Sequence, residues 1–107
     1  MVKAMVTITR ELVPDEDPDV SYLEQDEYQD RLKEYKRGMF GFVGVQAVAT
    51  ISVPYGRDWI ITHLRSPGIW GVENDSGEDH LNDIFSDEKA VLITMLEALH
   101  DFEIEEG

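Results

Sequence analysis

The chain has no cysteine, and no apolar run approaches the ~20 residues that span a bilayer. The absence of cysteine excludes disulfides and thiolate metal sites, and it fits a reducing compartment. The first residues alternate between apolar and polar side chains, so they lack the continuous apolar segment of a signal peptide. We therefore expect a soluble protein that acts in the cytoplasm.

Basic residues are scarce. Nine Lys and Arg face 23 Asp and Glu in 107 residues, which gives a formal net charge of −14 and a pI of about 4.3. Two long stretches, residues 11–30 and 73–88, contain no Lys or Arg at all. Four of the nine basic residues are crowded into Arg31–Arg37. Such a surface repels nucleic acid and anionic membranes and attracts basic surfaces.

Alternation of apolar and polar side chains predicts four strands, over residues 2–12, 40–53, 59–64 and 69–72. Prolines and acids at 13–19 end the first strand, and Pro54-Tyr55-Gly56-Arg57 supplies a turn between the second and third. The second and third strands are therefore expected to form a hairpin.

Helical spacing predicts two helical regions. The first has Tyr28, Leu32 and Tyr35 on its inner face and ends at Gly38. The second begins with a helical turn or short helix at 79–85, followed by a longer helix that Ser86 caps. The apolar face of that longer helix is expected to comprise Val91, Leu92, Met95, Ala98, Leu99 and Phe102.

The predicted order is thus β-α-β-β-β-α, in one domain that spans residues 1–107 and ends in a frayed acidic tail at 103–107. With 42% hydrophobic residues the chain can build a core. The simplest architecture is of the α+β class, an antiparallel sheet with the helices packed on one face.

No pattern in the sequence indicates catalysis. The glycine-rich phosphate motifs are missing, and the acidic loop at 73–79 does not have the EF-hand register. The three histidines, His63, His80 and His100, lack the spacing of a zinc site. We expect a protein that is not an enzyme and that has no catalytic residue, no metal and no cofactor.

The acidic residues are the candidate binding residues. Asp26, Asp30 and Glu34 recur every four residues, which on a helix places carboxylates about 6 Å apart, and such a row can imitate phosphates. An ordinary solvated helix face is the alternative interpretation. The expected contact surface consists first of Asp15, Glu16, Asp17, Asp19, Asp26, Asp30 and Glu34, and second of Glu73, Asp75, Glu78 and Asp79.

Trp70 is a further candidate binding residue. It lies in Ser66-Pro67-Gly68-Ile69-Trp70-Gly71, where two glycines flank a large aromatic side chain. Tryptophan is a common anchor of protein interfaces. Alternatively, Ile69 and Trp70 close one end of the core.

Three segments, residues 18–25 (PDVSYLEQ), 42–47 (FVGVQA) and 66–78 (SPGIWGVENDSGE), resemble small acidic proteins that recur in phage and prophage genomes. The resemblance implies a phage–host function, in the class that includes anti-CRISPR and antirestriction inhibitors. We therefore expect a non-enzymatic, nucleic-acid-mimicking inhibitor in the host cytoplasm, which binds the basic surface of a CRISPR effector or restriction enzyme. The alternatives are a phage accessory or structural protein that binds its partner through an apolar patch around Trp70, and a small hydrolase or ligand-binding domain.

The charge yields a first prediction. Because phosphate contacts need cations, the chain should not bind duplex DNA or RNA directly at about 0.15 M salt. A gel-shift titration checks this, and a shifted band at micromolar protein would contradict it.

Overall fold

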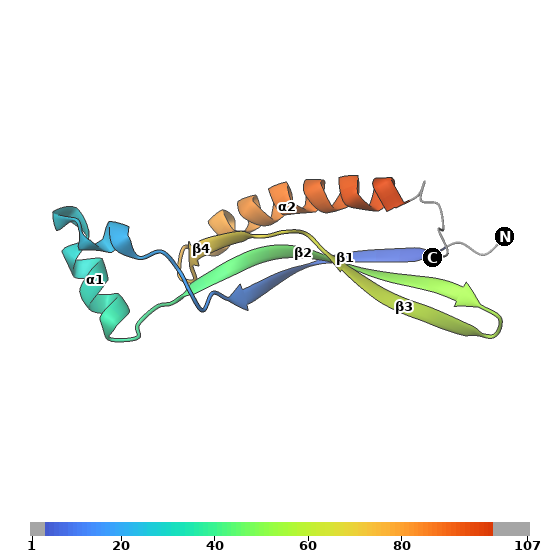
Figure 1. Cartoon of the computed structure of the whole chain (residues 1–107), viewed down its shortest axis with the longest axis horizontal. Coiled ribbons are helices and arrows are strands. Elements are labelled where there is room, and N and C mark those ends of the chain that lie inside the picture. Colours follow the sequence, from blue (N-terminus) through green and yellow to red (C-terminus); the bar gives the residue numbers. More distant parts are fainter. Residues whose placement is uncertain (1–3, 100–107) are drawn as a thin grey trace, which may run out of the picture.

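The sheet is built around β2 (Phe42–Tyr55), a strand of 14 residues without a charged side chain. In the computed structural model, which describes residues 4–99, β1 (Met5–Pro14) pairs with one edge of β2. The other edge of β2 pairs with two strands: β4 (Ile69–Glu73) along its first residues, and β3 (Asp58–Arg65) along the rest. All pairings are antiparallel. Because β3 and β4 share one edge of β2, the sheet has four strands but is three strands wide. Figure 1 shows β2 running through the middle of an elongated molecule.

The β2–β3 hairpin closes at Gly56-Arg57, between the paired residues Tyr55 and Asp58. Gly56 has a φ of 61°, which suits the first central position of a type II′ turn. The strands therefore continue through Pro54 and Tyr55, which the sequence pattern had placed in the turn.

A buried polar contact fixes the break between β3 and β4. The Glu88 carboxylate is 5% exposed and accepts hydrogen bonds from the Ser66 hydroxyl and the Gly68 N–H. The Ser66 hydroxyl in turn accepts a hydrogen bond from the Ala47 N–H. Because each buried polar group has a partner, the chain can leave one strand and begin the next on the same edge of β2.

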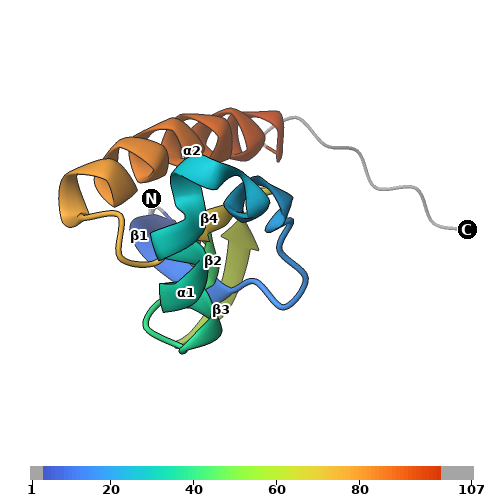
Figure 2. The same cartoon turned by 90° about the vertical axis from the view of Figure 1, so that its left-hand side faces the viewer.

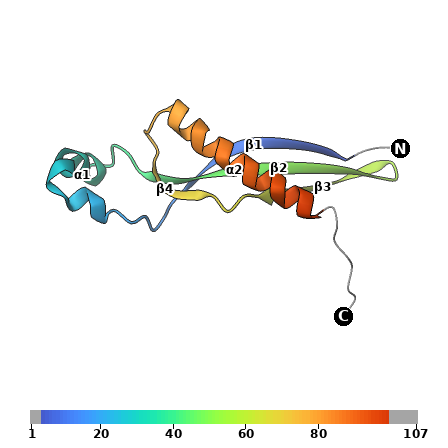
Figure 3. The same ribbon diagram turned by 90° about the horizontal axis from the view of Figure 1, so that it is seen from above.

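α2 (Glu78–Leu99) covers one face of the sheet and crosses it obliquely (Figure 3). It is one continuous helix, so the predicted interruption before Ser86 is wrong. No Gly or Pro lies between residues 78 and 99, and a serine inside a helix costs only a fraction of a kcal/mol. Leu81 and Leu92 are its buried apolar side chains, packed against Val45 and Ala47 of β2 and their neighbours.

The other helical segments form a small lobe beyond the end of the sheet (Figures 1 and 2). This helical lobe consists of two 3-10 turns, η1 (Ser21–Glu24) and η2 (Asp26–Tyr28), and of α1 (Gln29–Lys36). Gly38, with a φ of 73°, follows the helix as predicted. Leu23 is fully buried against Phe40 and Phe42, which attaches the lobe to the start of β2.

The α+β class and the predicted order of strands and helices are confirmed, with the two 3-10 turns added. Of the helices, α2 lies on the sheet face, whereas α1 lies at its end. The face of the sheet opposite α2 carries no helix in the part of the chain that the structure describes (Figure 2). The predicted tail at 103–107 and Phe102 lie outside the described residues.

The helix face determines a second prediction. Leu92 is fully buried, whereas Leu99 is 47% exposed, so the expectation that Leu99 lies on the buried face is wrong. Leu92→Ala should lower the free energy of unfolding by about 2–5 kcal/mol because it leaves a cavity. Leu99→Ala, the matched control, should lower it by less than about 1 kcal/mol. Urea unfolding of the two variants checks the order, and equal losses would mean that α2 is rotated.

Candidate partner-binding surface

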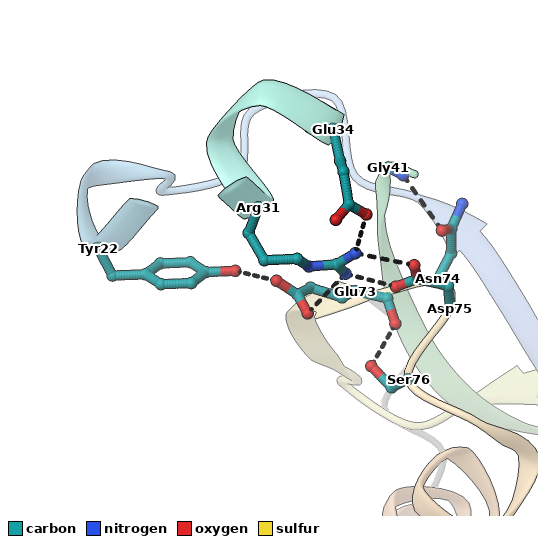
Figure 4. Close-up of polar contacts among 8 residues, drawn as sticks. All are labelled: Tyr22, Arg31, Glu34, Gly41, Glu73, Asn74, Asp75 and Ser76. Atoms are coloured by element: carbon teal, nitrogen blue, oxygen red, sulfur yellow. Dashed lines mark hydrogen bonds and ion pairs between the residues drawn. The ribbon is translucent and has the colours of Figure 1, made fainter. Parts of the chain in front are cut away.

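Arg31 joins the helical lobe to the end of the sheet. Its guanidinium donates hydrogen bonds to Asp75 at 2.6 Å and 3.1 Å, to Glu73 at 3.0 Å and to Glu34 at 2.9 Å (Figure 4). The same group lies 3.6 Å from the centre of the Phe40 ring. One cation from α1 therefore holds three carboxylates and an aromatic ring, and two of those carboxylates lie at the end of β4 and in the loop after it.

Tyr22 and Asn74 extend this contact. The Tyr22 hydroxyl donates a hydrogen bond of 2.6 Å to Glu73, and the Asn74 side chain accepts one of 3.1 Å from the Gly41 N–H. Burial, followed by the hydrogen bond to Glu73, raises the pKa of Tyr22. The hydrogen bond from Arg31 is the main cause that lowers the pKa of Asp75. The site thus favours the neutral phenol of Tyr22, which donates to Glu73, and the ionised carboxylate of Asp75.

This arrangement changes the role of three predicted contact residues. Glu34, Glu73 and Asp75 all pair with Arg31, so part of their charge is compensated within the chain. Glu78 likewise pairs with Arg10 at 2.8 Å. A cation on a partner would have to compete with a guanidinium already in place, so these four carboxylates are better explained as structural.

Asp15 and Asp19 hold loops together. One Asp15 oxygen accepts a hydrogen bond of 2.9 Å from the Gly71 N–H, and the other accepts one of 3.2 Å from the Asp17 N–H. Asp19 accepts hydrogen bonds from the backbone and the hydroxyl of Ser21, and the hydroxyl contact is the first cause that lowers its pKa. Both residues thus order the connection between β1 and the lobe.

A second group of carboxylates has no such contacts. Six exposed side chains between residues 16 and 30 have no hydrogen-bond or ion-pair partner within residues 4–99: Glu16, Asp17, Glu24, Asp26, Glu27 and Asp30. We call these six the acidic lobe surface. Four of them were predicted contacts. Glu24 and Glu27 were not, although they lie in the same stretch without Lys or Arg.

The predicted row of carboxylates along one helix is not formed as expected. α1 has only eight residues and contains Asp30 and Glu34, whereas Asp26 lies in the preceding 3-10 turn. Glu34 is bound to Arg31. Asp26 and Asp30 remain exposed, but they do not belong to a row of free carboxylates along one helix.

Trp70 lies flat against the sheet, on the face opposite α2. A methyl group added at Gly44 would come within 2.4 Å of its ring, so Gly44 leaves the space that the indole fills. The indole N–H donates a hydrogen bond of 3.0 Å to the Pro67 carbonyl, and the side chain is 47% exposed. Trp70 therefore covers the sheet, and its outer side remains accessible. The remaining predicted contact, Asp79, is exposed in the first turn of α2.

Within residues 4–99 there is no cavity and no cluster of three or more metal-binding side chains. Among the described helices, none is both long and apolar enough to cross a membrane. Comparison with protein-family models, with curated proteins and with solved structures finds no match.

The Arg31 contacts generate a third prediction. The folded pKa of Asp75 lies below its unfolded value of about 3.8, so the ion pair stabilises the fold above that pH and is lost as pH falls through the folded pKa. Asp75→Asn should therefore lower the free energy of unfolding at pH 7. The difference from wild type should shrink below about pH 4.

Asp79→Asn is the matched control, because Asp79 has no ion pair within residues 4–99. Chemical unfolding at a series of pH values measures both variants. A difference between wild type and Asp75→Asn that stays constant down to pH 2 would show that the ion pair does not stabilise the fold.

Proposed function

We propose that this chain is a non-enzymatic protein that binds a basic, nucleic-acid-handling surface of a host defence complex. The acidic lobe surface carries the proposal. Six exposed carboxylates lie in the loop that leads from β1 into the helical lobe and in the first part of the lobe, and they have no hydrogen-bond or ion-pair partner within residues 4–99. Such a group of carboxylates offers a partner the negative charge that its Lys and Arg otherwise find on phosphates.

The lobe is suited to this task because its order does not depend on the six carboxylates of the acidic lobe surface. Leu23 packs against Phe40 and Phe42 at the start of β2, and Arg31 ties the lobe to Glu73 and Asp75. The acidic side chains on the outside therefore start from a fixed backbone, which reduces the ordering that binding requires. Mutual repulsion among them also weakens the free protein slightly, and a basic partner relieves that repulsion.

The resemblance to phage and prophage proteins supports the nature of the target. An inhibitor of a CRISPR effector or restriction enzyme can act by occupying the cationic groove in which DNA or RNA binds. On this proposal the chain acts as a competitor of nucleic acid, by steric and electrostatic exclusion, and performs no chemistry.

The alternative, a phage accessory or structural protein that binds through Trp70, also has an observation in its favour. The outer side of the indole is accessible on a sheet face that no described helix covers. The same ring fills the space above Gly44, which gives it a role in the fold without a partner. The acidic lobe surface lacks such an internal explanation, and we therefore favour it.

The proposal leads to a fourth prediction. A partner should first be captured from host lysate with the tagged chain and identified by mass spectrometry. Its association rate should fall at least tenfold from low to high salt, because the attraction between opposite charges is screened. The joint change of Asp17, Asp26 and Asp30 to Asn should slow association to a similar extent and leave the thermal midpoint unchanged or slightly higher.

The matched control removes three negative charges from α2, by changing Asp83 and Asp87 to Asn and Glu97 to Gln, all exposed positions. This control variant should slow association much less than the lobe variant, because it lowers the net negative charge by the same amount but leaves the acidic lobe surface intact. Duplex DNA should compete with the chain for the partner. Salt-independent binding that Trp70→Ala abolishes, while the lobe variant leaves it intact, would refute the proposal in favour of the alternative.

A further inference from the structure

At the end opposite the helical lobe, β3 is an edge strand that is apolar on both faces. Trp59, Ile60 and Ile61 are 50%, 51% and 60% exposed. Ile60 pairs with Val53, on the face that α2 covers elsewhere, and the hairpin extends past the end of the helix (Figures 1 and 3). Trp59 and Ile61 point to the other face, since side chains alternate along a strand. Within residues 4–99, neither face of the strand is covered at residues 59–61, whereas Leu64 near its other end packs against the cluster that contains Leu92 of α2.

β3 also lacks the features that normally prevent an edge strand from pairing. Its eight residues include no Pro and no Lys, its charges are confined to its ends at Asp58 and Arg65, and its register with β2 has no shift. The other edge strands differ. β1 carries Arg10 and Glu11 in its middle, and β4 has a register shift against β2. The unprotected edge is therefore specific to β3 among the described strands.

Few negative charges lie on the β2–β3 hairpin, so the hairpins of two copies of the chain can approach each other. Asp58 is the single Asp or Glu between residues 38 and 72, and the other 22 carboxylates of the chain lie outside that range. The helical lobe with its acidic surface is at the far end of a molecule about 60 Å long (Figure 1). That separation far exceeds the Debye length of about 8 Å at physiological salt, so the acidic lobes would not repel one another across a hairpin contact.

We propose that the occupant of this edge is a second copy of the chain, with β3 paired antiparallel to β3 of its partner. The inference is independent of the proposed function, because it concerns the opposite end of the molecule. A two-fold axis normal to the sheet brings the two edges together and keeps both α2 helices on the same face. The result is a continuous sheet of strand order β1-β2-β3-β3-β2-β1.

Symmetry restricts the register. Directly opposite residues must point to the same face, so the axis has to pass beside a single residue rather than between two. The middle of β3 offers Ile61 and Thr62. With Ile61 on the axis, Trp59 lies opposite His63 of the partner subunit. With Thr62 on the axis, Ile60 lies opposite Leu64 of the partner subunit and Trp59 opposite Arg65 of the partner subunit.

The edge of β3 offers the area of a weak dimer. Three apolar side chains of β3 are substantially exposed: Trp59, Ile60 and Ile61. At roughly 200 Å² for a large residue, their exposed fractions leave about 300 Å² of apolar surface on each chain, or about 600 Å² for two chains. This area is typical of weak association, and the backbone of the paired edges adds hydrogen bonds. We therefore expect a weak dimer that forms at high protein concentration.

Sedimentation equilibrium of the untagged full chain tests the dimer as a fifth prediction. Its mass should rise with concentration from 12.2 kDa towards twice that value. Ile61→Lys should raise the dissociation constant at least tenfold, since it places a charge on the paired edge. Met5→Lys is the matched control, because Met5 is 61% exposed on the opposite edge of the sheet and gains the same charge. Circular dichroism should show both variants folded.

Introduced cysteines test the symmetry, since the chain has none of its own. Under mild oxidation, Ile61→Cys or Thr62→Cys should form a disulfide-linked dimer, whichever of them lies on the axis. Thr7→Cys, at an exposed position on β1, should form no disulfide-linked dimer. A wild-type chain that remains monomeric up to its solubility limit overturns the proposal. So does a dimer that Met5→Lys disrupts and Ile61→Lys does not, or one that is linked through Thr7→Cys alone.

Discussion

Every part of the described fold depends on the pairing of β2. β1 runs along one side of it for ten residue pairs, and β3 and β4 share the other side. The odd-numbered residues from Val43 to Ile51 provide the surface on which α2 packs. Apolar side chains are required at those positions, because an ionised group between the sheet and α2 would not stay hydrated. All 23 acidic residues lie outside β2.

The strands and the α+β class could be predicted because their signal is local. Alternating β-branched residues identified β1, β2 and β3, and Gly38 identified the end of α1. The length of α2 was missed because Ser86 and Asp87 form a good helix start that the chain does not use. Leu81 and Leu92 both pack on the sheet, and a single continuous helix puts them on the same face. This packing overrides the local preference for a helix start at Ser86.

The candidate site was only partly predictable, for a different reason. A sequence shows where carboxylates are numerous but not which of them a distant cation compensates. Arg31 is 42 residues from Glu73 and 44 from Asp75, so nothing in their spacing indicated the ion pairs. The same holds for Glu88, which is buried against Ser66 and Gly68 although it lies 22 and 20 residues from them in the sequence. The apolar edge of β3 was read as an ordinary hairpin strand, since sequence periodicity does not reveal which face is left uncovered.

The helical lobe is inserted between two strands that are direct neighbours. Pro14 at the end of β1 lies opposite Val43 at the start of β2, and the Asp15 N–H donates a hydrogen bond of 2.9 Å to the Phe42 carbonyl. The chain therefore leaves the sheet after β1 and returns to it at the same place at the start of β2, so that the lobe occupies the position of a hairpin loop. Selection or protein engineering could lengthen, exchange or shorten this loop, provided that Phe40 and Phe42 remain covered, without altering the register of the sheet. The sheet then serves as a scaffold on which the helical lobe can diversify separately.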